Sequence, residues 1–199
     1  MSSWLRGLII AYDRVYRWVH GLNQPKSLVG PAVRLKLARS RRTIWLTDGC
    51  LVRRGDLIGL IHLNNDRLMA LHADGLRPEA IGVEFRRLFT SSLTELARLT
   101  DSGEPLAEVR AFTATTILHH GLRRVGFEAS SGGSARSALV TTYQRALLAS
   151  LHPAGRTRLD AGSRHRAQQL WISRDTLRAR FRHPQRPAAA RRRSRPTEA

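Results

Sequence analysis

Apolar side chains recur along this chain at two spacings, one typical of helices and the other of strands. Near the start, one apolar stripe at helical spacing predicts an amphipathic helix that ends at Gly21 and Pro25. Such a stripe packs against a protein core more often than it lies on a membrane surface, although the basic residues beside it suit both. The stripe consists of Leu5, Leu8, Ile9, Tyr12, Val15, Tyr16 and Val19.

Short apolar runs bounded by turn residues then predict a sheet. The run from Leu57 to Leu63 is apolar on both faces of its pleat, which is typical of a central strand rather than an edge strand. We expect the other strands at residues 43–46, 50–52, 108–114, 125–129 and 169–172.

Longer segments with helical periodicity accompany these strands. We expect helices at residues 66–73, 79–100, 115–124 and 135–151, and a last capped helix that ends near Phe181. This order predicts a single α+β domain, residues 1–182, in which helices pack on a mixed β-sheet. Residues 183–199 are rich in arginine and proline and have no apolar periodicity, so we expect a disordered basic tail there.

The net charge of +19 is concentrated at the two ends of the chain. Residues 61–130 carry 8 basic and 9 acidic side chains, whereas residues 131–199 carry 15 and 3. Of the 34 cations, 32 are arginines, whose forked side chains suit phosphate and carboxylate groups. The excess indicates either an anionic partner, such as nucleic acid, anionic lipid or acidic glycan, or the amino-acid bias of a GC-rich genome.

Several classes of site lack support in the sequence. The single Cys50 excludes an internal disulfide, and no local motif marks it as a nucleophile. His119 and His120 are adjacent on an expected helix, where their side chains should point in different directions, so we expect no metal site and no cofactor. The longest apolar stretch near the start, residues 7–12, is far shorter than the roughly 18 residues of a membrane span. We therefore expect neither a transmembrane helix nor a signal peptide, and a cytoplasmic location.

Polar residues close the expected central strand in the stretch RRGDLIGLIHLNND, residues 53–66. His62 lies on that strand, and Asn64 and Asn65 follow at its carboxyl end, where α/β proteins often bind ligands. The donors and acceptors of these side chains suit a sugar hydroxyl or a carbonyl group. Asparagine is also a preferred helix N-cap, and Asp66 favours the helix dipole, so capping is an alternative explanation for one of the two asparagines.

The stretch LWISRDTLRARF, residues 170–181, allows two interpretations. It resembles the turn and second helix of a helix-turn-helix, but Trp171 stands where such motifs carry glycine, and the segment before it lacks an apolar stripe. We favour a short strand followed by a capped helix. In the DNA-binding alternative the contacting cations would be Arg174, Arg178, Arg180, Arg191, Arg192 and Arg193.

Three stretches together resemble the YkoP-like domain, a bacterial family of unsettled function. They are AYDRVYRW in the first helix, DGCLVRRGDLIGLIHLNNDRL around the expected strands, and HPAGRTRL followed by LWISRDTL. The similarity implies an α+β domain that occurs alone or fused to polysaccharide deacetylase domains, without catalytic residues that can be transferred to this chain. It is densest after the central strand, which adds Arg67 to the candidate ligand-binding residues His62, Asn64 and Asn65.

These observations lead to three hypotheses. The first is a non-catalytic accessory domain that binds an envelope carbohydrate or a lipid-linked precursor at the end of the strand 57–63. The second is a nucleic-acid-binding protein that uses residues 170–181 and the basic tail. The third, ranked last, is an enzyme in which His62 acts with a carboxylate such as Asp56 or Glu84.

Overall fold

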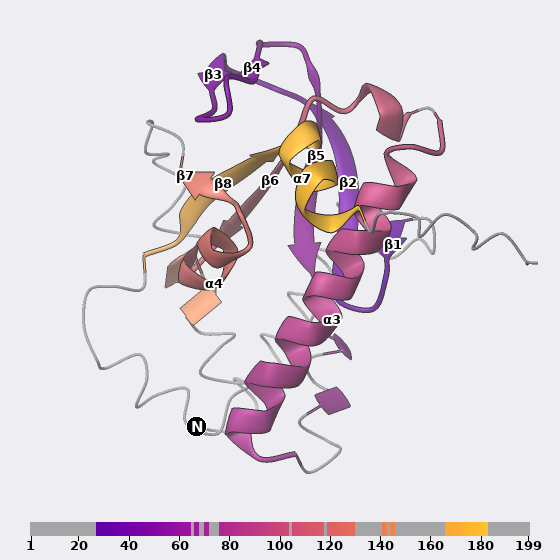
Figure 1. Ribbon diagram of the computed structural model, residues 1–199. Coiled ribbons are helices and arrows are strands. Elements are labelled where there is room, and N and C mark those ends of the chain that lie inside the picture. The colour runs from indigo at the N-terminus through magenta and orange to yellow at the C-terminus, as the bar shows by residue number, and fades with distance from the viewer. Residues whose placement is uncertain are drawn as a thin grey trace, which may run out of the picture.

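A six-stranded mixed sheet forms the centre of the fold (Figure 1). The computed structural model of the chain describes residues 27–64, 66–67, 70–71, 76–103, 105–117, 119–129, 141–142, 144–145 and 166–182. In spatial order the strands are β1 (Leu28–Val29), β2 (Val33–Arg39), β5 (Leu57–Leu63), β6 (Ala111–Thr116), β8 (Gln168–Ser173) and β7 (Glu128–Ala129). Strands β5 and β6 are parallel, and the other neighbouring pairs in this sheet are antiparallel.

Strand β5 has the bounds that its apolar pattern predicts, and it lies between β2 and β6, so its central position is confirmed. Its neighbour β2 was not among the predicted strands; β2 pairs with β5 over seven residues, from Val33 opposite Leu63 to Arg39 opposite Leu57. The period-two alternation VRLKLAR is the signal that identifies this strand.

One face of the sheet packs against helices α3 (Pro78–Leu99) and α7 (Arg174–Phe181), which lie side by side in Figure 1. The shorter helix α4 (His119–Arg124) adds Leu122 to the same core. Gly59 of β5 allows the Phe112 ring to lie directly on the strand, because a Cβ atom there would be 2.3 Å from Phe112 Cδ1. The largest fully buried members of this core are Phe112, Leu93, Leu96, Leu170, Ile172, Leu177, Val33 and Val109.

A hairpin of β3 (Ile44–Trp45) and β4 (Leu51–Val52) covers one end of the opposite face, at the top of Figure 1. A second core lies beneath the hairpin and consists of Ile44, Leu46, Val52, Ile58, Ala111 and Trp171. Trp45 alternates with these residues and points outward, with 68% of its surface exposed. Further along the same face, β2 and β5 carry Arg34, Lys36 and His62.

Most helix and strand assignments from the sequence are confirmed with shifted ends. Helix α3 begins one residue earlier than expected, with Pro78 in the first position that proline favours. The expected strand 108–114 starts only at Ala111, because the 3₁₀ turn η2 (Leu106–Glu108) precedes it. The expected helix 115–124 starts at His119, because residues 115 and 116 still pair with β8.

The α+β class with a mixed sheet packed by helices is thus confirmed. The expected N-terminal amphipathic helix, most of the expected helix 135–151 and the basic tail, residues 183–199, lie outside the described residues. Of the expected helix 66–73, residues 66–67 and 70–71 are described and are helical. Of the helices within the described part of the chain, none combines the length and the hydrophobicity needed to cross a bilayer.

Candidate functional site

His62 lies near the carboxyl end of β5, on the sheet face opposite α3. Its direct cross-strand neighbour is Arg34 of β2. Arg34 Nη2 lies 3.5 Å from Asp66 Oδ2, and the Arg34 side chain is 14% exposed. The fold therefore places beside the predicted site residue His62 an arginine that also lies close to Asp66.

Asn64 holds the turn between β1 and β2 against the end of β5. Its backbone N–H donates to the Ala32 carbonyl at 2.9 Å, and its side-chain Nδ2 donates to the Pro31 carbonyl at 3.2 Å. The residue is only 9% exposed. Within the described residues, Asn64 Oδ1 accepts no hydrogen bond, so its side chain caps none of the described N–H groups of the following turn. Asn65, the other predicted cap or ligand residue, lies outside the described residues.

The first turn after β5 contains an acceptor and a donor that do not satisfy each other. The Arg67 backbone N–H donates to the Asn64 carbonyl at 3.1 Å, which places both residues in one turn. Asn64 Oδ1 and Arg67 Nε are both buried, and neither has a hydrogen-bond partner among the described residues. Buried polar atoms are nearly always paired in native proteins, which makes these two atoms candidates for contact with a water molecule or a ligand group.

The carboxylates that the enzyme hypothesis gives to His62 lie elsewhere. Asp56 precedes β5, so the length of the strand, about 3.3 Å per residue, separates it from His62. Glu84 belongs to α3, on the other side of the sheet, where it accepts two hydrogen bonds from Arg87 at 2.8 and 2.7 Å. These bonds hold the pKa of Glu84 below its usual value. Neither carboxylate is placed to act with His62.

The opposite end of β5 contains a cleft of about 320 Å³ that is lined mainly by charged residues. Three segments meet there: the last residue of β2, the turn from β4 to β5, and the residues just before β6. The lining residues are Arg39, Arg53, Gly55, Asp56, Leu57, Glu108 and Arg110. This end of the strand was not part of the predicted site.

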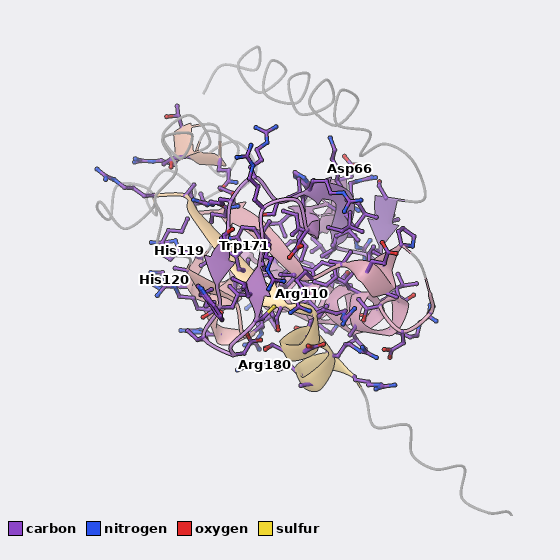
Figure 2. All side chains as sticks on the ribbon, turned by 90° about the horizontal axis from the view of Figure 1, so that it is seen from above. Asp66, Arg110, His119, His120, Trp171 and Arg180 are labelled. Atoms are coloured by element: carbon purple, nitrogen blue, oxygen red, sulfur yellow. The ribbon has the colours of Figure 1, made fainter. Side chains whose placement is uncertain are left out.

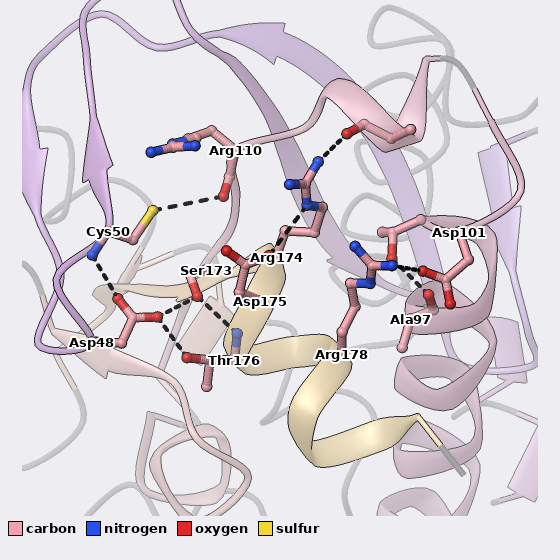
Figure 3. Close-up of polar contacts among 12 residues, drawn as sticks. Asp48, Cys50, Ala97, Asp101, Arg110, Ser173, Arg174, Asp175, Thr176 and Arg178 are labelled. Atoms are coloured by element: carbon pink, nitrogen blue, oxygen red, sulfur yellow. Dashed lines mark hydrogen bonds and ion pairs between the residues drawn. The ribbon is translucent and has the colours of Figure 1, made fainter. Parts of the chain in front are cut away.

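A cluster of hydrogen bonds beside this cleft ties the β3–β4 hairpin to the start of α7 (Figure 3). Asp48 accepts hydrogen bonds from the Ser173 hydroxyl, from Thr176 Oγ1 at 2.6 Å and from the Cys50 N–H at 3.0 Å. Partial burial alone would raise the pKa of Asp48, but these hydrogen bonds outweigh it and hold the pKa below the usual 3.8. The cluster is therefore built around an ionised carboxylate.

Cys50 takes part in this cluster through its backbone rather than as a reactive thiol. Its Sγ lies 3.9 Å from the Arg110 carbonyl oxygen. Burial raises the pKa of the thiol, although the positive charge of Arg110 opposes the shift. A protonated thiol is a poor nucleophile at neutral pH, so the geometry fits a packing role for Cys50.

The segment 170–181 is a strand followed by a helix, and the helix-turn-helix interpretation is wrong. Residues 168–173 form β8 inside the sheet, between β6 and β7. Ser173 then caps α7, because its Oγ accepts a hydrogen bond from the Thr176 N–H at 2.9 Å. The favoured interpretation, a short strand followed by a capped helix, is confirmed, and the helix starts at Arg174.

The cations of α7 are directed mainly toward neighbouring elements (Figure 3). Arg174 donates to the Ala107 carbonyl, and Arg178 forms an ion pair with Asp101 at the end of α3. Arg180 is exposed, and its side chain lies over Gly126. A Cβ atom added at Gly126 would lie only 2.7 Å from Arg180 Cδ. The tail arginines 191–193 lie outside the described residues, so DNA contact through either group stays a prediction.

His119 and His120 lie on α4, and Figure 2 labels them apart from Asp66 and Arg110. Their ring centroids are 4.3 Å apart with an angle of 41° between the planes, so the expectation that the two imidazoles point apart is wrong. His119 is buried and His120 is exposed.

The model of the YkoP domain matches residues 2–181 of the chain. The chain belongs to the YkoP domain family. No curated protein and no solved structure matches it. The match confirms the resemblance that the sequence motifs carry, and it assigns a domain type without assigning an activity.

The YkoP domain thus presents one candidate site that sequence reasoning found and another that it missed. The fold brings His62, Asn64 and Arg67 to the carboxyl end of β5, as predicted. The arginine cleft at the amino end is formed by residues up to 71 positions apart, from Arg39 to Arg110, and only the strand register brings them together. In the sequence, the excess of arginine was the one indication of a site of this kind.

Proposed function

We propose that this YkoP domain is a non-catalytic accessory domain that binds a carbohydrate of the cell envelope at the carboxyl end of β5. The residues proposed to contact the ligand are His62, Asn64, Asn65 and Arg67. The observation that carries the proposal is the unsatisfied pair of Asn64 Oδ1 and Arg67 Nε. A sugar hydroxyl can donate to the first atom and accept from the second, because a hydroxyl group does both.

The chemistry around His62 favours binding over catalysis. Asp56 and Glu84, the carboxylates considered as partners, are on other parts of the fold, and Asp66 lies close to the positive charge of Arg34. General acid and base groups must reach the same reacting atoms within about 3 Å. A binding site needs only directed donors and acceptors beside a rigid strand, which β5 provides.

The link to envelope glycans rests on the family resemblance, since similar domains occur fused to polysaccharide deacetylase domains. Such glycans carry hydroxyl and N-acetyl groups, which are hydrogen-bond donors and acceptors without a net charge. A side-chain amide and a guanidinium Nε can form hydrogen bonds with these groups.

Calorimetric titration of the full chain with N-acetylglucosamine tetramer tests this proposal. We expect binding in the wild type, and a loss of at least about tenfold in affinity in the Arg67→Met variant, which keeps the aliphatic stem and removes the donors. Arg86→Met, on the exposed side of α3, is the matched control and should bind like the wild type. Equal binding by both variants would remove the site, and no binding by the wild type would remove the function.

Nucleic-acid binding through charge is the alternative function, favoured by the net charge of +19. Charge alone predicts binding to duplex DNA that falls steeply with salt and has no sequence preference. Fluorescence anisotropy over a salt series, repeated after deletion of residues 184–199, tests it. A sequence preference that survives the deletion would favour a dedicated DNA site over the glycan proposal.

A further inference from the structure

We propose that the cleft at the amino end of β5 is a second binding site, for a small hydroxyl-bearing molecule that carries a phosphate or carboxylate group. In this site Arg39, Arg53 and Arg110 hold the anionic group. The inference does not depend on the glycan site, which lies at the other end of the same strand.

The backbone around Leu57 fixes the positions of the three arginines. Arg39 is the direct cross-strand partner of Leu57, and the Arg110 N–H donates to the Leu57 carbonyl at 2.9 Å. The Arg53 N–H donates to Asp56 Oδ2 at 2.7 Å, which closes the turn that leads into β5. Because all three Cα positions belong to one hydrogen-bonded frame, the side chains are presented together rather than on independent loops.

Two of the guanidinium groups are held by backbone carbonyls, which do not neutralise their positive charge. Arg39 Nη1 donates to the Gly55 carbonyl at 3.2 Å, and Arg110 Nε donates to the Leu51 carbonyl at 3.3 Å. Both partners are neutral. Within the described residues, none of the three guanidinium groups forms an ion pair with a carboxylate. Three cations in one cleft repel each other, and a bound anion with two or three oxygen acceptors relieves that repulsion.

The rest of the lining indicates what accompanies the anionic group. Asp56 and Glu108 also line the cleft, so five of its seven lining residues are charged. Carboxylates repel an anion but accept hydrogen bonds from hydroxyl groups. A volume of about 320 Å³ is at the lower end of the range for small-molecule sites and exceeds the size of a bare phosphate ion. A sugar phosphate or a sugar carboxylate satisfies both requirements.

Arg54 separates a specific site from a generally basic surface. It is adjacent to Arg53 and also exposed, yet it does not line the cleft. Its backbone N–H donates to Thr43 Oγ1 at 3.3 Å. Removing the charge of Arg53 or of Arg54 changes the overall electrostatic field of the surface equally. A difference in anion affinity between the two variants therefore indicates a specific site.

Calorimetric titration of the full chain with glucose 6-phosphate, glucuronate and inorganic phosphate tests the proposal. We expect at least one of the two sugar acids to bind more tightly than inorganic phosphate, and the better one identifies the preferred group. Arg53→Gln and Arg110→Gln should each weaken its binding by about tenfold or more, because each removes a charged donor. Arg54→Gln should stay within about twofold of the wild type.

Three results would overturn the proposal. The first is no binding of either sugar acid by the wild type, and the second is an equal loss of affinity in Arg54→Gln and Arg53→Gln. The third is equal affinity for inorganic phosphate and both sugar acids, which contradicts the roles of Asp56 and Glu108. Binding of N-acetylglucosamine tetramer by Arg53→Gln should match the wild type, so failure of the glycan site is distinguishable from failure of this one.

Discussion

The two ends of β5 use polar residues in different ways. At the carboxyl end, Asn64 is buried and directs its backbone and side-chain donors to the carbonyls of the β1–β2 turn. At the amino end, Arg53 and Arg110 are exposed and face a cleft with no carboxylate in ion-pair contact. The hydrogen bonds of Asn64 stabilise the fold, whereas the exposed guanidinium donors of Arg53 and Arg110 face the cleft.

The two proposed sites therefore rest on the donors and acceptors that the fold leaves unused, more than on the type of residue. The polar residues after β5 look like a site in the sequence, yet most of the hydrogen bonds of Asn64 have structural partners. What remains for a ligand there is a single acceptor on Asn64 and a donor on Arg67. The arginines of the cleft look like ordinary surface charge in the sequence, and yet they keep most of their donors.

The largest expected effect concerns Gly59, in the middle of the strand that joins the two ends. An alanine Cβ at this position would lie 2.3 Å from Phe112 Cδ1, so we expect Gly59→Ala to destabilise the fold by about 2–3 kcal/mol. The free energy of unfolding in urea measures this change. Gly82→Ala, on α3 with nothing within 4 Å, is the matched control and should stabilise by up to about 1 kcal/mol. Equal stability of Gly59→Ala and the wild type would show that the Phe112 ring moves freely.

The contrast between the two ends predicts opposite effects on stability and binding. Asn64→Ala removes a buried side-chain hydrogen bond and should cost about 1–2 kcal/mol of unfolding free energy. Arg53→Gln should change this free energy by less than about 0.5 kcal/mol, although it weakens anion binding. Urea denaturation of both variants measures the comparison. A larger stability loss in Arg53→Gln than in Asn64→Ala would reverse the roles given to the two ends.

Asp48 predicts a pH-dependent contribution beside the arginine cleft. Its pKa in the folded protein lies below the usual 3.8, so folding favours the ionised form. The resulting stability is fully present above about pH 4 and is lost as the pH falls toward the folded pKa. Asp48→Asn should therefore cost about 1 kcal/mol at neutral pH, and the difference from the wild type should shrink below about pH 4. Urea denaturation across this pH range checks the sign, and a difference that grows on acidification would contradict it.

The smallest effect is expected away from both ends, at the pair of Glu84 and Arg87 on α3. Exposed pairs of this spacing contribute little, so Glu84→Gln should leave the unfolding free energy close to that of the wild type. It should also leave binding of N-acetylglucosamine tetramer unchanged. A loss of glycan binding in this variant would revive the idea that Glu84 acts with His62.

The elements that the sequence predicts well are those with a strong local signal. Strand β5 has a continuous apolar run, the β3–β4 hairpin has a Thr-Asp-Gly turn, and α3 has a long apolar stripe that ends in Asp-Ser-Gly. Strand β2 also had a clear signal, the alternation VRLKLAR, which the analysis missed. The later start of β6 depends on its pairing with β8, in which Ala114 lies opposite Leu170, 56 residues further along the chain, and local sequence does not contain this information.

The candidate sites divide in the same way. His62, Asn64 and Arg67 are within six residues, so a reader of the sequence can group them. Asn64 donates hydrogen bonds to the carbonyls of Pro31 and Ala32, in the turn that leads into β2, so its structural role could not be predicted without that strand. The arginine cleft requires the register of β2 with β5 and of β5 with β6, because its cations come from three segments.

Amide chemical-shift mapping of the ¹⁵N-labelled full chain with two probes tests most directly whether the two ends bind different chemistry. With N-acetylglucosamine tetramer, we predict shifts of the amides around His62, Asn64 and Arg67. With glucose 6-phosphate or glucuronate, whichever binds better, we predict shifts around Arg53, Gly55 and Arg110 and none at the other end. Shifts from both probes at the same end, or from neither probe at either end, would contradict the account.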